Sequence, residues 1–196
     1  MEMTTLIILA HPSSDSFNHA IAKTCMKVLA SLNHQIIFHD LYEEKFNPVL
    51  DITEITDKET VKEDIRIYCD ELVNADQIIF IHPNWWGQPP AILKGWIDRV
   101  VKSGVAYQFL DGDNGEGIPV GLLKCKKSFV FNTSNTNKER EMSVFGDPLQ
   151  RIWEDCILKF CGIEILHRRM FETIVTSSVE QRKAWLSEVE EILRKF

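Results

Sequence analysis

The sequence predicts a doubly wound α/β fold, in which helices cover both faces of a five-stranded parallel sheet. Two observations predict it: five short apolar runs recur along the chain, and a helix signal follows each of them. Strands of a parallel sheet read as continuous apolar runs because helices bury both of their faces, whereas a strand with one wet face alternates polar and apolar residues.

Three strand–helix units are expected in the first half of the chain. The apolar runs at 6–10, 36–39 and 78–81 predict the strands. Apolar residues at helical spacing predict helices between 21 and 32 and within 56–72. The third helix is expected to begin at Pro89 or Pro90, because the first turn of a helix tolerates a residue that lacks an N–H.

The second half begins with an irregular segment, residues 103–124, which is rich in glycine and aspartate. Strands are then expected at 128–132 and at 163–166 or slightly beyond, and helices at 149–160 and 179–196. The chain shows no repeat or interdomain linker, so residues 1–196 are expected to form a single domain. A chain of 196 residues buries enough surface to fold without disulfides or metal.

Charge and cysteine usage narrow the class of protein. A net charge of −7 excludes a strongly basic surface for nucleic acid or a polybasic membrane anchor. Neither a signal peptide nor a membrane-spanning run is expected, so the predicted location is the cytoplasm. The five cysteines include no C-x-x-C pair and mostly fall on apolar faces, which predicts buried reduced thiols and no metal site.

The turn after the first strand has an unusual composition. No glycine precedes Gly87, which excludes the G-x-G-x-x-G turn of a dinucleotide-binding unit and the glycine-rich P-loop. The turn reads HPSSDSFN, residues 11–18. The hydroxyls of Ser13, Ser14 and Ser16 and the free amides of the helix start can hold a phosphate. A plain serine-rich helix cap is the alternative interpretation.

Two further loops follow strands at the same edge of the predicted sheet. In open α/β sheets, ligands bind at the carboxyl ends of the strands, beside the point where the strand order reverses. For the order 2-1-3-4-5, this point lies by strands 1 and 3. PNWWG, residues 83–87, follows strand 3 and can wall a flat ring, with packing of the tryptophans on the next helix as the alternative. NTSNT, residues 132–136, follows strand 4 and offers hydroxyls and amides.

Five segments together carry a family resemblance: AHPSSDSFNHA, DLYEEKFNP, PAILKGWIDRV, VAYQF and FCGIEIL. As a set they resemble the NAD(P)H:quinone oxidoreductase family, the DT-diaphorase-like branch of the flavodoxin-like fold, over about residues 5–190. The resemblance implies a homodimeric flavoprotein that takes hydride from NADH or NADPH onto its flavin. It then passes two electrons to a quinone or a similar small acceptor, such as an azo or nitro compound.

The resemblance also assigns residues. The turn after strand 1 is implied to take the flavin phosphate and ribityl chain, PNWWG to lie along the isoalloxazine, and TSNT to meet its polar edge. Arg182 matches an arginine that reaches the adenylate half of FAD, which favours FAD over FMN; a solvated helix charge is the alternative. The residues implied to hold the flavin are His11, Ser16, Phe17, Asn18, Pro83, Asn84, Trp85, Trp86, Gly87, Thr133, Ser134, Asn135, Thr136 and Arg182.

The loop after strand 4 departs from the family pattern. Animal members place a tyrosine and a histidine near the flavin edge to supply a proton, but here the loop is about two residues shorter and Phe145 takes the place of the histidine. Lys138 and Arg140 are alternative candidates for stabilising an anionic reduced flavin. Tyr107 and Phe109 match two tyrosines that close the pocket from the partner subunit. The candidates for the substrate pocket are therefore Trp86, Gly87, Tyr107, Phe109 and Phe145.

Two other functions stay open on the sequence alone. Flavin-binding relatives include cytoplasmic subunits that activate potassium-efflux channels, so a regulatory subunit of a membrane transport system is the first alternative. A flavodoxin-type electron carrier is the second, but such carriers recognise FMN through a loop containing glycine, which HPSSDSFN lacks.

Overall fold

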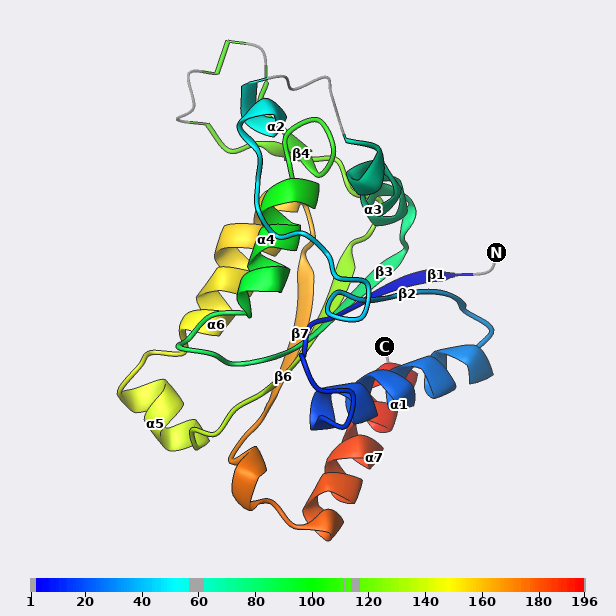
Figure 1. Cartoon of the computed structure of the whole chain (residues 1–196), viewed down its shortest axis with the longest axis vertical. Helices are drawn as coiled ribbons and strands as arrows, with labels where there is room; N and C mark the ends of the chain where they lie inside the picture. Colours follow the sequence, from blue (N-terminus) through cyan, green and yellow to red (C-terminus); the bar gives the residue numbers. More distant parts are fainter. Residues whose placement is uncertain (1–2, 57–61, 111, 114–116, 196) are drawn as a thin grey trace.

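The computed structural model describes residues 3–56, 62–110, 112–113 and 117–195. At its centre, five parallel strands lie in the order β2-β1-β3-β6-β7, which confirms the predicted order 2-1-3-4-5 (Figure 1). The strands are β1 (Thr4–Leu9), β2 (Gln35–Asp40), β3 (Gln77–Pro83), β6 (Lys127–Thr133) and β7 (Ile165–Phe171).

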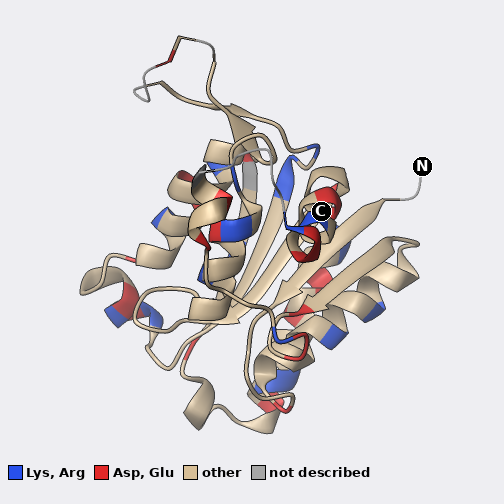
Figure 2. Ribbon diagram, turned by 45° about the horizontal axis from the view of Figure 1, so that its top comes forward, with Lys and Arg blue, Asp and Glu red and all other residues tan. Residues whose placement is uncertain are grey.

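Helices cover both faces of the sheet. On one face α1 (Phe17–Ser31) and α7 (Val179–Lys195) lie side by side (Figure 1). The opposite face is covered by α3 (Glu63–Asn74), by α4 (Ala91–Val100) and by the helical segment that follows β6. Figure 2 shows charged residues of both signs spread over the helices and loops.

The central strands contribute side chains to two separate cores, which explains their continuous apolar runs. In β1, Ile7 and Leu9 point into the core beneath α1 and α7, whereas Leu6 and Ile8 point into the core beneath α3 and α4. Alternate side chains of a strand project to opposite faces, so a strand that is covered on both faces needs apolar residues throughout. All seven residues of β3 are buried for the same reason.

Several elements differ from the sequence prediction. The helix expected at 149–160 is built from α6 (Pro148–Arg151), a π-helical turn η1 (Ile152–Leu158) and a 3-10 turn η2 (Lys159–Cys161). Of the stretch expected to be helical within 56–72, Thr56 ends a short helix α2 (Ile52–Thr56) and residues 63–72 belong to α3; residues 57–61 lie outside the described residues. The segment 103–124 contains a small antiparallel pair, β4 (Tyr107–Gln108) and β5 (Val120–Gly121). A short helix, α5 (Lys138–Ser143), was not predicted.

The cysteines are all free, and four of them are buried, as their positions on apolar faces predict. Cys156, in η1, is exposed and is the exception to that prediction. Among the described residues, none of the helices combines the length and the apolar character that crossing a bilayer requires.

Candidate functional site

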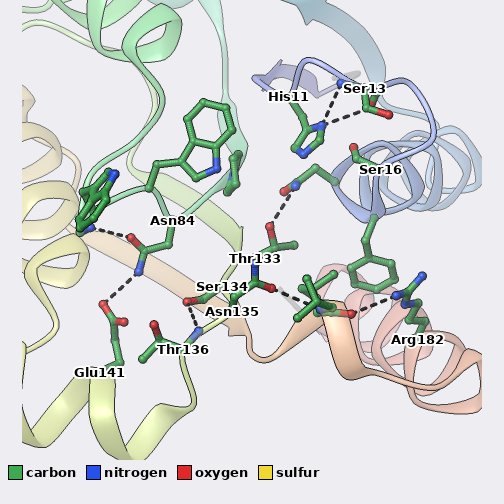
Figure 3. Close-up of a pocket in the computed structure, with 18 of the residues that line it drawn as sticks. His11, Ser13, Ser16, Asn84, Thr133, Ser134, Asn135, Thr136, Glu141 and Arg182 are labelled. Atoms are coloured by element: carbon green, nitrogen blue, oxygen red, sulfur yellow. Dashed lines mark hydrogen bonds between the residues drawn. The ribbon is translucent and has the colours of Figure 1, made fainter.

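A pocket of about 810 Å³ opens at the carboxyl ends of β1, β3 and β6 (Figure 3). This is the edge of the sheet at which the strand order reverses, where open α/β folds bind their ligands. The size falls within the usual range of about 300 to 1,000 Å³ for small-molecule sites. Its wall includes every residue implied to hold a flavin, together with Phe145. The further lining residues are Ser13, Asp15, Glu141, Pro148, Ile174 and Val175.

The turn from β1 into α1 supplies hydrogen-bond donors to the pocket. Ser16 is the N-cap of α1, and its Oγ accepts from His19 N at 3.3 Å. The first amides of a helix have no intrahelical partner, and together with the helix dipole they favour an anion. Asn18 Nδ2 donates to Thr133 Oγ1 at 3.0 Å, whereas the buried Oδ1 of Asn18 has no partner among the described residues. The turn therefore presents several donors and one unpaired acceptor.

The loop after β3 is held by Asn84. Its backbone N donates to Thr133 O at 2.6 Å, its Nδ2 donates to Glu141 Oε1 at 3.0 Å, and its Oδ1 accepts from Gly87 N at 2.9 Å. The backbone and side chain of this one residue thus join the loop after β3 to β6 and α5 around the pocket (Figure 3). This density of contacts fixes the backbone that walls the pocket.

The two tryptophans of this loop are not packed on the following helix, so that alternative is wrong. Trp86 is fully exposed and has φ of +58°, and Trp85 is 42% exposed. A non-glycine residue in the left-handed region is strained, and such strain gathers at functional sites. Gly87 has φ of +74°, and a Cβ there would lie 2.7 Å from Pro148 Cγ, so this position requires glycine.

The loop after β6 is anchored to the connection between β7 and α7. Ser134 N donates to Phe171 O at 2.8 Å, and Ile174 N donates to Ser134 O at 3.1 Å. Thr136 N donates to Ser134 Oγ at 3.0 Å. The segment 133–136 therefore lines the pocket with a fixed backbone, opposite the β1–α1 turn (Figure 3).

Glu141 is the main pocket residue that the sequence reasoning missed. It lies on α5, is 1% exposed, and points toward Asn84 (Figure 3). The available signal was Asn137, the N-cap of α5, whose side chain accepts from Arg140 N at 2.9 Å. Asparagine is a preferred N-cap residue, but α5 has too few apolar residues to show a helical period.

Of the cationic residues considered in the sequence analysis, Arg182 lines the pocket, and Lys138 and Arg140 do not. Neither Lys138 nor Arg140 lines the pocket; the Arg140 guanidinium instead lies over the Phe145 ring, 5.4 Å from its centroid. Arg182 does line the pocket, which contradicts the reading of a plain solvated charge. Its Nε donates to Ser177 Oγ at 2.8 Å, and an NH₂ group donates to Ile174 O at 3.0 Å.

Tyr107 and Phe109 do not line the pocket of their own chain. Their rings pack on each other with centroids 6.0 Å apart and on Phe160, at 4.7 Å from Tyr107 and 6.0 Å from Phe109. A single chain therefore leaves these two residues without a role at the site.

A neutral histidine lies directly beneath the site. His82 in β3 is fully buried, and burial lowers its pKa to about 4. Trp153 Nε1 donates to His82 Nε2 at 3.0 Å, so the ring hydrogen sits on Nδ1, which donates to Pro83 O at 2.8 Å. The hydrogen bond to Pro83 O fixes the carbonyl that precedes Asn84, and the neutral His82 ring adds no charge beneath the site.

These features suit a phosphorylated ligand with a flat ring. Phosphate needs donors, which the start of α1 and Ser16 provide, and a flat ring needs close backbone and apolar walls, which Trp85, Trp86 and Gly87 provide. The polar groups of 133–136 lie where the edge of such a ring carries its own polar atoms. The residues present therefore fit a flavin nucleotide.

Comparisons with known proteins agree with this interpretation. A family model described as flavodoxin-like fold matches residues 3–195. An uncharacterized NAD(P)H oxidoreductase of Haemophilus influenzae is 38% identical over 189 residues, which cover 94% of this chain and 91% of that protein. The NAD(P)H dehydrogenase (quinone) 1 of Rattus norvegicus is 29% identical over 192 residues, covering 86% of this chain and 68% of that protein. The crystal structure of Smu.1420 from Streptococcus mutans superposes with a TM-score of 0.86 at 32% identity, covering 99% of this chain and 100% of that one.

Proposed function

Because this chain belongs to the NAD(P)H:quinone oxidoreductase family of the flavodoxin-like fold, we propose that it is a flavin-dependent oxidoreductase. It takes two electrons from NADH or NADPH and passes them to a quinone or a related small acceptor, including azo or nitro compounds. The observation that carries this proposal is the pocket itself, which joins a helix start with free donors to an aromatic wall at the switch point of the sheet.

The chain's residues act by binding and orienting. Ser16 and the first amides of α1 hold the phosphate, and the loop at Trp86 and Gly87 supports one side of the ring. When bound, the flavin supplies the hydride chemistry. Asn84 keeps the supporting loop in place through its three hydrogen bonds, so the nicotinamide and then the acceptor meet a wall of fixed shape.

The working unit in this proposal is a homodimer with shared pockets. Tyr107 and Phe109 form an aromatic cluster outside their own pocket, and exposed apolar side chains continue beside it, with Ile118 88% exposed and Leu110 65% exposed. A surface of this kind marks an interface, and closed two-fold dimers are the commonest oligomers.

The cofactor of this proposal is FAD, with FMN as the alternative. Arg182 lies in the pocket wall and donates to Ile174 O, and its charge suits a second phosphate or an adenine ring. A cytoplasmic location is also part of the proposal, and it is supported by five cysteines that are all free.

An absorption spectrum of the purified protein, followed by chromatography of the released flavin, tests the cofactor. Steady-state oxidation of NADH and NADPH with a quinone tests the enzyme. Flavin without NAD(P)H-dependent turnover would instead indicate an electron carrier. Turnover that is incidental to a tightly co-purifying membrane transporter would indicate a regulatory subunit. A protein that binds no flavin would contradict the proposal itself.

A further inference from the structure

Ser16, His19 and Asp40 form a hydrogen-bonded chain that leads from the pocket into the protein. Ser16 Oγ lies 2.9 Å from His19 Nδ1, and His19 Nε2 lies 2.8 Å from Asp40 Oδ2. The side chains of His19 and Asp40 are 12% and 8% exposed. Of the three residues, only Ser16 lines the pocket. Whatever His19 does to a ligand must therefore act through the Ser16 hydroxyl.

Asp40 fixes one end of this chain. Its Oδ1 accepts from Tyr42 N at 3.1 Å and from Glu43 N at 3.3 Å, so the side chain acts as a hydrogen-bond acceptor. An ionised carboxylate only accepts hydrogen bonds, so His19 Nε2 must carry a hydrogen. The remaining choice is whether His19 Nδ1 also carries one.

That choice sets the direction of the Ser16 hydroxyl. In a neutral imidazole, Nδ1 accepts the Ser16 hydrogen, so the hydroxyl offers the pocket only a lone pair. In an imidazolium, Nδ1–H donates to Ser16 Oγ, which also accepts from His19 N, and the hydroxyl hydrogen is free to point into the pocket. Phosphate oxygens accept hydrogen bonds, so only the second state lets Ser16 donate to a phosphate.

Charged and titratable groups from several elements face His19. The start of α1 carries the partial positive charge of the helix dipole, and Asp40 from β2 contacts the His19 ring. His11, from the β1–α1 loop, has its ring centroid 6.4 Å from that of His19, and burial lowers the pKa of His11, which limits repulsion. Asp15 lies in the turn before α1, and the exposed Lys23 lies one turn beyond His19 on α1. An arriving phosphate adds negative charge next to this set and shifts it toward the imidazolium.

We propose that His19 is a positioning residue that takes up one proton from solvent when a phosphate group binds at Ser16. The proton from solvent forms an N–H bond at His19 Nδ1, no other covalent bond forms or breaks, and the Ser16 hydroxyl hydrogen turns from His19 to the phosphate. The inference rests on the proposed function only in taking the flavin's phosphate as the bound anion. Histidine suits this role because its charge changes between about pH 5 and 8.

The test is the binding of FAD to flavin-free protein, because the diphosphate of FAD does not itself titrate near neutral pH. Calorimetry in two buffers with different ionisation enthalpies measures the protons taken up, and fluorescence titration measures affinity across pH. We expect the uptake to approach one proton per FAD bound at pH values where His19 is neutral in the flavin-free protein. In that range the affinity should fall by up to tenfold for each pH unit. Riboflavin, which lacks phosphate, should bind without this dependence.

Variants distinguish proton uptake through Ser16 and His19 from a general effect on folding. His19→Gln is expected to abolish proton uptake by removing the group that takes up the proton, and Ser16→Ala is expected to reduce it by removing the hydroxyl that links His19 to the phosphate. His34→Gln is the matched control, because His34 contacts Thr5 Oγ1 near the start of β1 and should leave the uptake unchanged. Equal uptake in the wild-type protein, in His19→Gln and in Ser16→Ala, or FAD binding without uptake, would overturn the inference alone. A complete absence of flavin binding would overturn the proposed function as well.

Discussion

Asn84 and Glu141 are joined by a hydrogen bond of 3.0 Å between Nδ2 and Oε1, although they lie on different elements 57 residues apart. Asn84 follows β3, and Glu141 lies on α5, which the β6 loop leads into. The same amide of Asn84 also accepts from Gly87 N, so the Trp-Trp-Gly loop is held against α5. The shape of the pocket therefore depends on a contact between this loop and α5.

We expect Asn84→Ala to loosen this arrangement. It leaves the buried Glu141 carboxylate without its amide donor, and losing the partner of a buried polar group costs about 1–3 kcal/mol. Flavin content after purification should fall, together with the midpoint of urea denaturation. Gln88→Ala is the control, because the Gln88 side chain is exposed and the backbone of this residue makes the two bonds to Trp85. Equal flavin content in both variants would show that the Asn84–Glu141 contact does not shape the site.

The central strands could be predicted from sequence because burial on both faces leaves a continuous apolar run, as in β3. The edge strand β7 was predicted only in part, because a strand was expected at 163–166 or slightly beyond, whereas β7 runs over Ile165–Phe171. Its charged residues look like a loop, but Arg168 pairs with Asp147 at 2.6 Å and Arg169 with Glu188 at 2.6 Å. An edge strand tolerates such residues because its outer side is not enclosed by another strand. The pairing partners come from distant parts of the chain, so no local pattern reveals them.

The loops that line the site could be predicted from the sequence, but the hydrogen bonds between side chains of separate elements could not. HPSSDSFN and PNWWG follow strands of the switch point, so the topology alone brings them together. Glu141 depends on Asn84, and the chain between Ser16 and Asp40 depends on His19 facing the end of β2. Each of these requires the positions of side chains from separate elements. The sequence carries no periodic signal for such contacts.

We predict that Gly87→Ala is more destabilising than Gly146→Ala. Both glycines have positive φ, +74° and +70°, so alanine is strained at either position. Only at Gly87 would the added Cβ also meet Pro148 Cγ, at 2.7 Å, whereas nothing lies within 4 Å at Gly146. Backbone strain of this kind costs about 1–3 kcal/mol. Urea denaturation of both variants measures the difference, and equal losses would show that the contact with Pro148 relaxes freely.

Shared pockets can be tested by mixing two inactive subunits. Trp86→Ala removes the wall of one chain's own pocket, and Tyr107→Ala removes the residue proposed to enter the partner's pocket. In a heterodimer of the two variants, one pocket carries both changes and the other carries neither. We therefore expect quinone reduction to recover toward half of the wild-type value per heterodimer after mixed refolding or co-expression. Activity that stays at the level of the separate variants, or wild-type activity of a monomer in sedimentation experiments, would contradict the shared pocket.

His82 should make the stability of the fold depend on pH. Its folded pKa of about 4 lies below the usual value of 6.5, so the unfolded chain binds the proton more readily. The free energy of unfolding should then fall as pH drops from about 6.5 to about 4, by up to about 3 kcal/mol from this residue. Urea denaturation across this range should show a shallower slope for His82→Gln than for the wild type. His34→Gln is the comparison for a partly buried histidine, and it should change the slope less than His82→Gln, although burial also lowers the pKa of His34. A wild-type slope in His82→Gln would contradict the assignment.

Phe145 and Trp86 should affect different half-reactions. Hydride transfer needs the nicotinamide stacked at roughly 3 to 3.5 Å, so the wall at Trp86 governs positioning, and Trp86→Ala should mainly slow flavin reduction by NAD(P)H.

Phe145 lines the pocket at 48% exposure where relatives are implied to carry a histidine, so Phe145→His introduces a proton donor. A well-placed general acid contributes about 10² to 10⁴ in rate, so the variant should speed reoxidation by quinone or give it a new pH dependence. Stopped-flow absorbance separates the two half-reactions, with Val144→His as the control because Val144 is exposed and does not line the pocket. If Phe145→His behaves as Val144→His does while Trp86→Ala is reduced normally, neither residue lies beside the reacting ring.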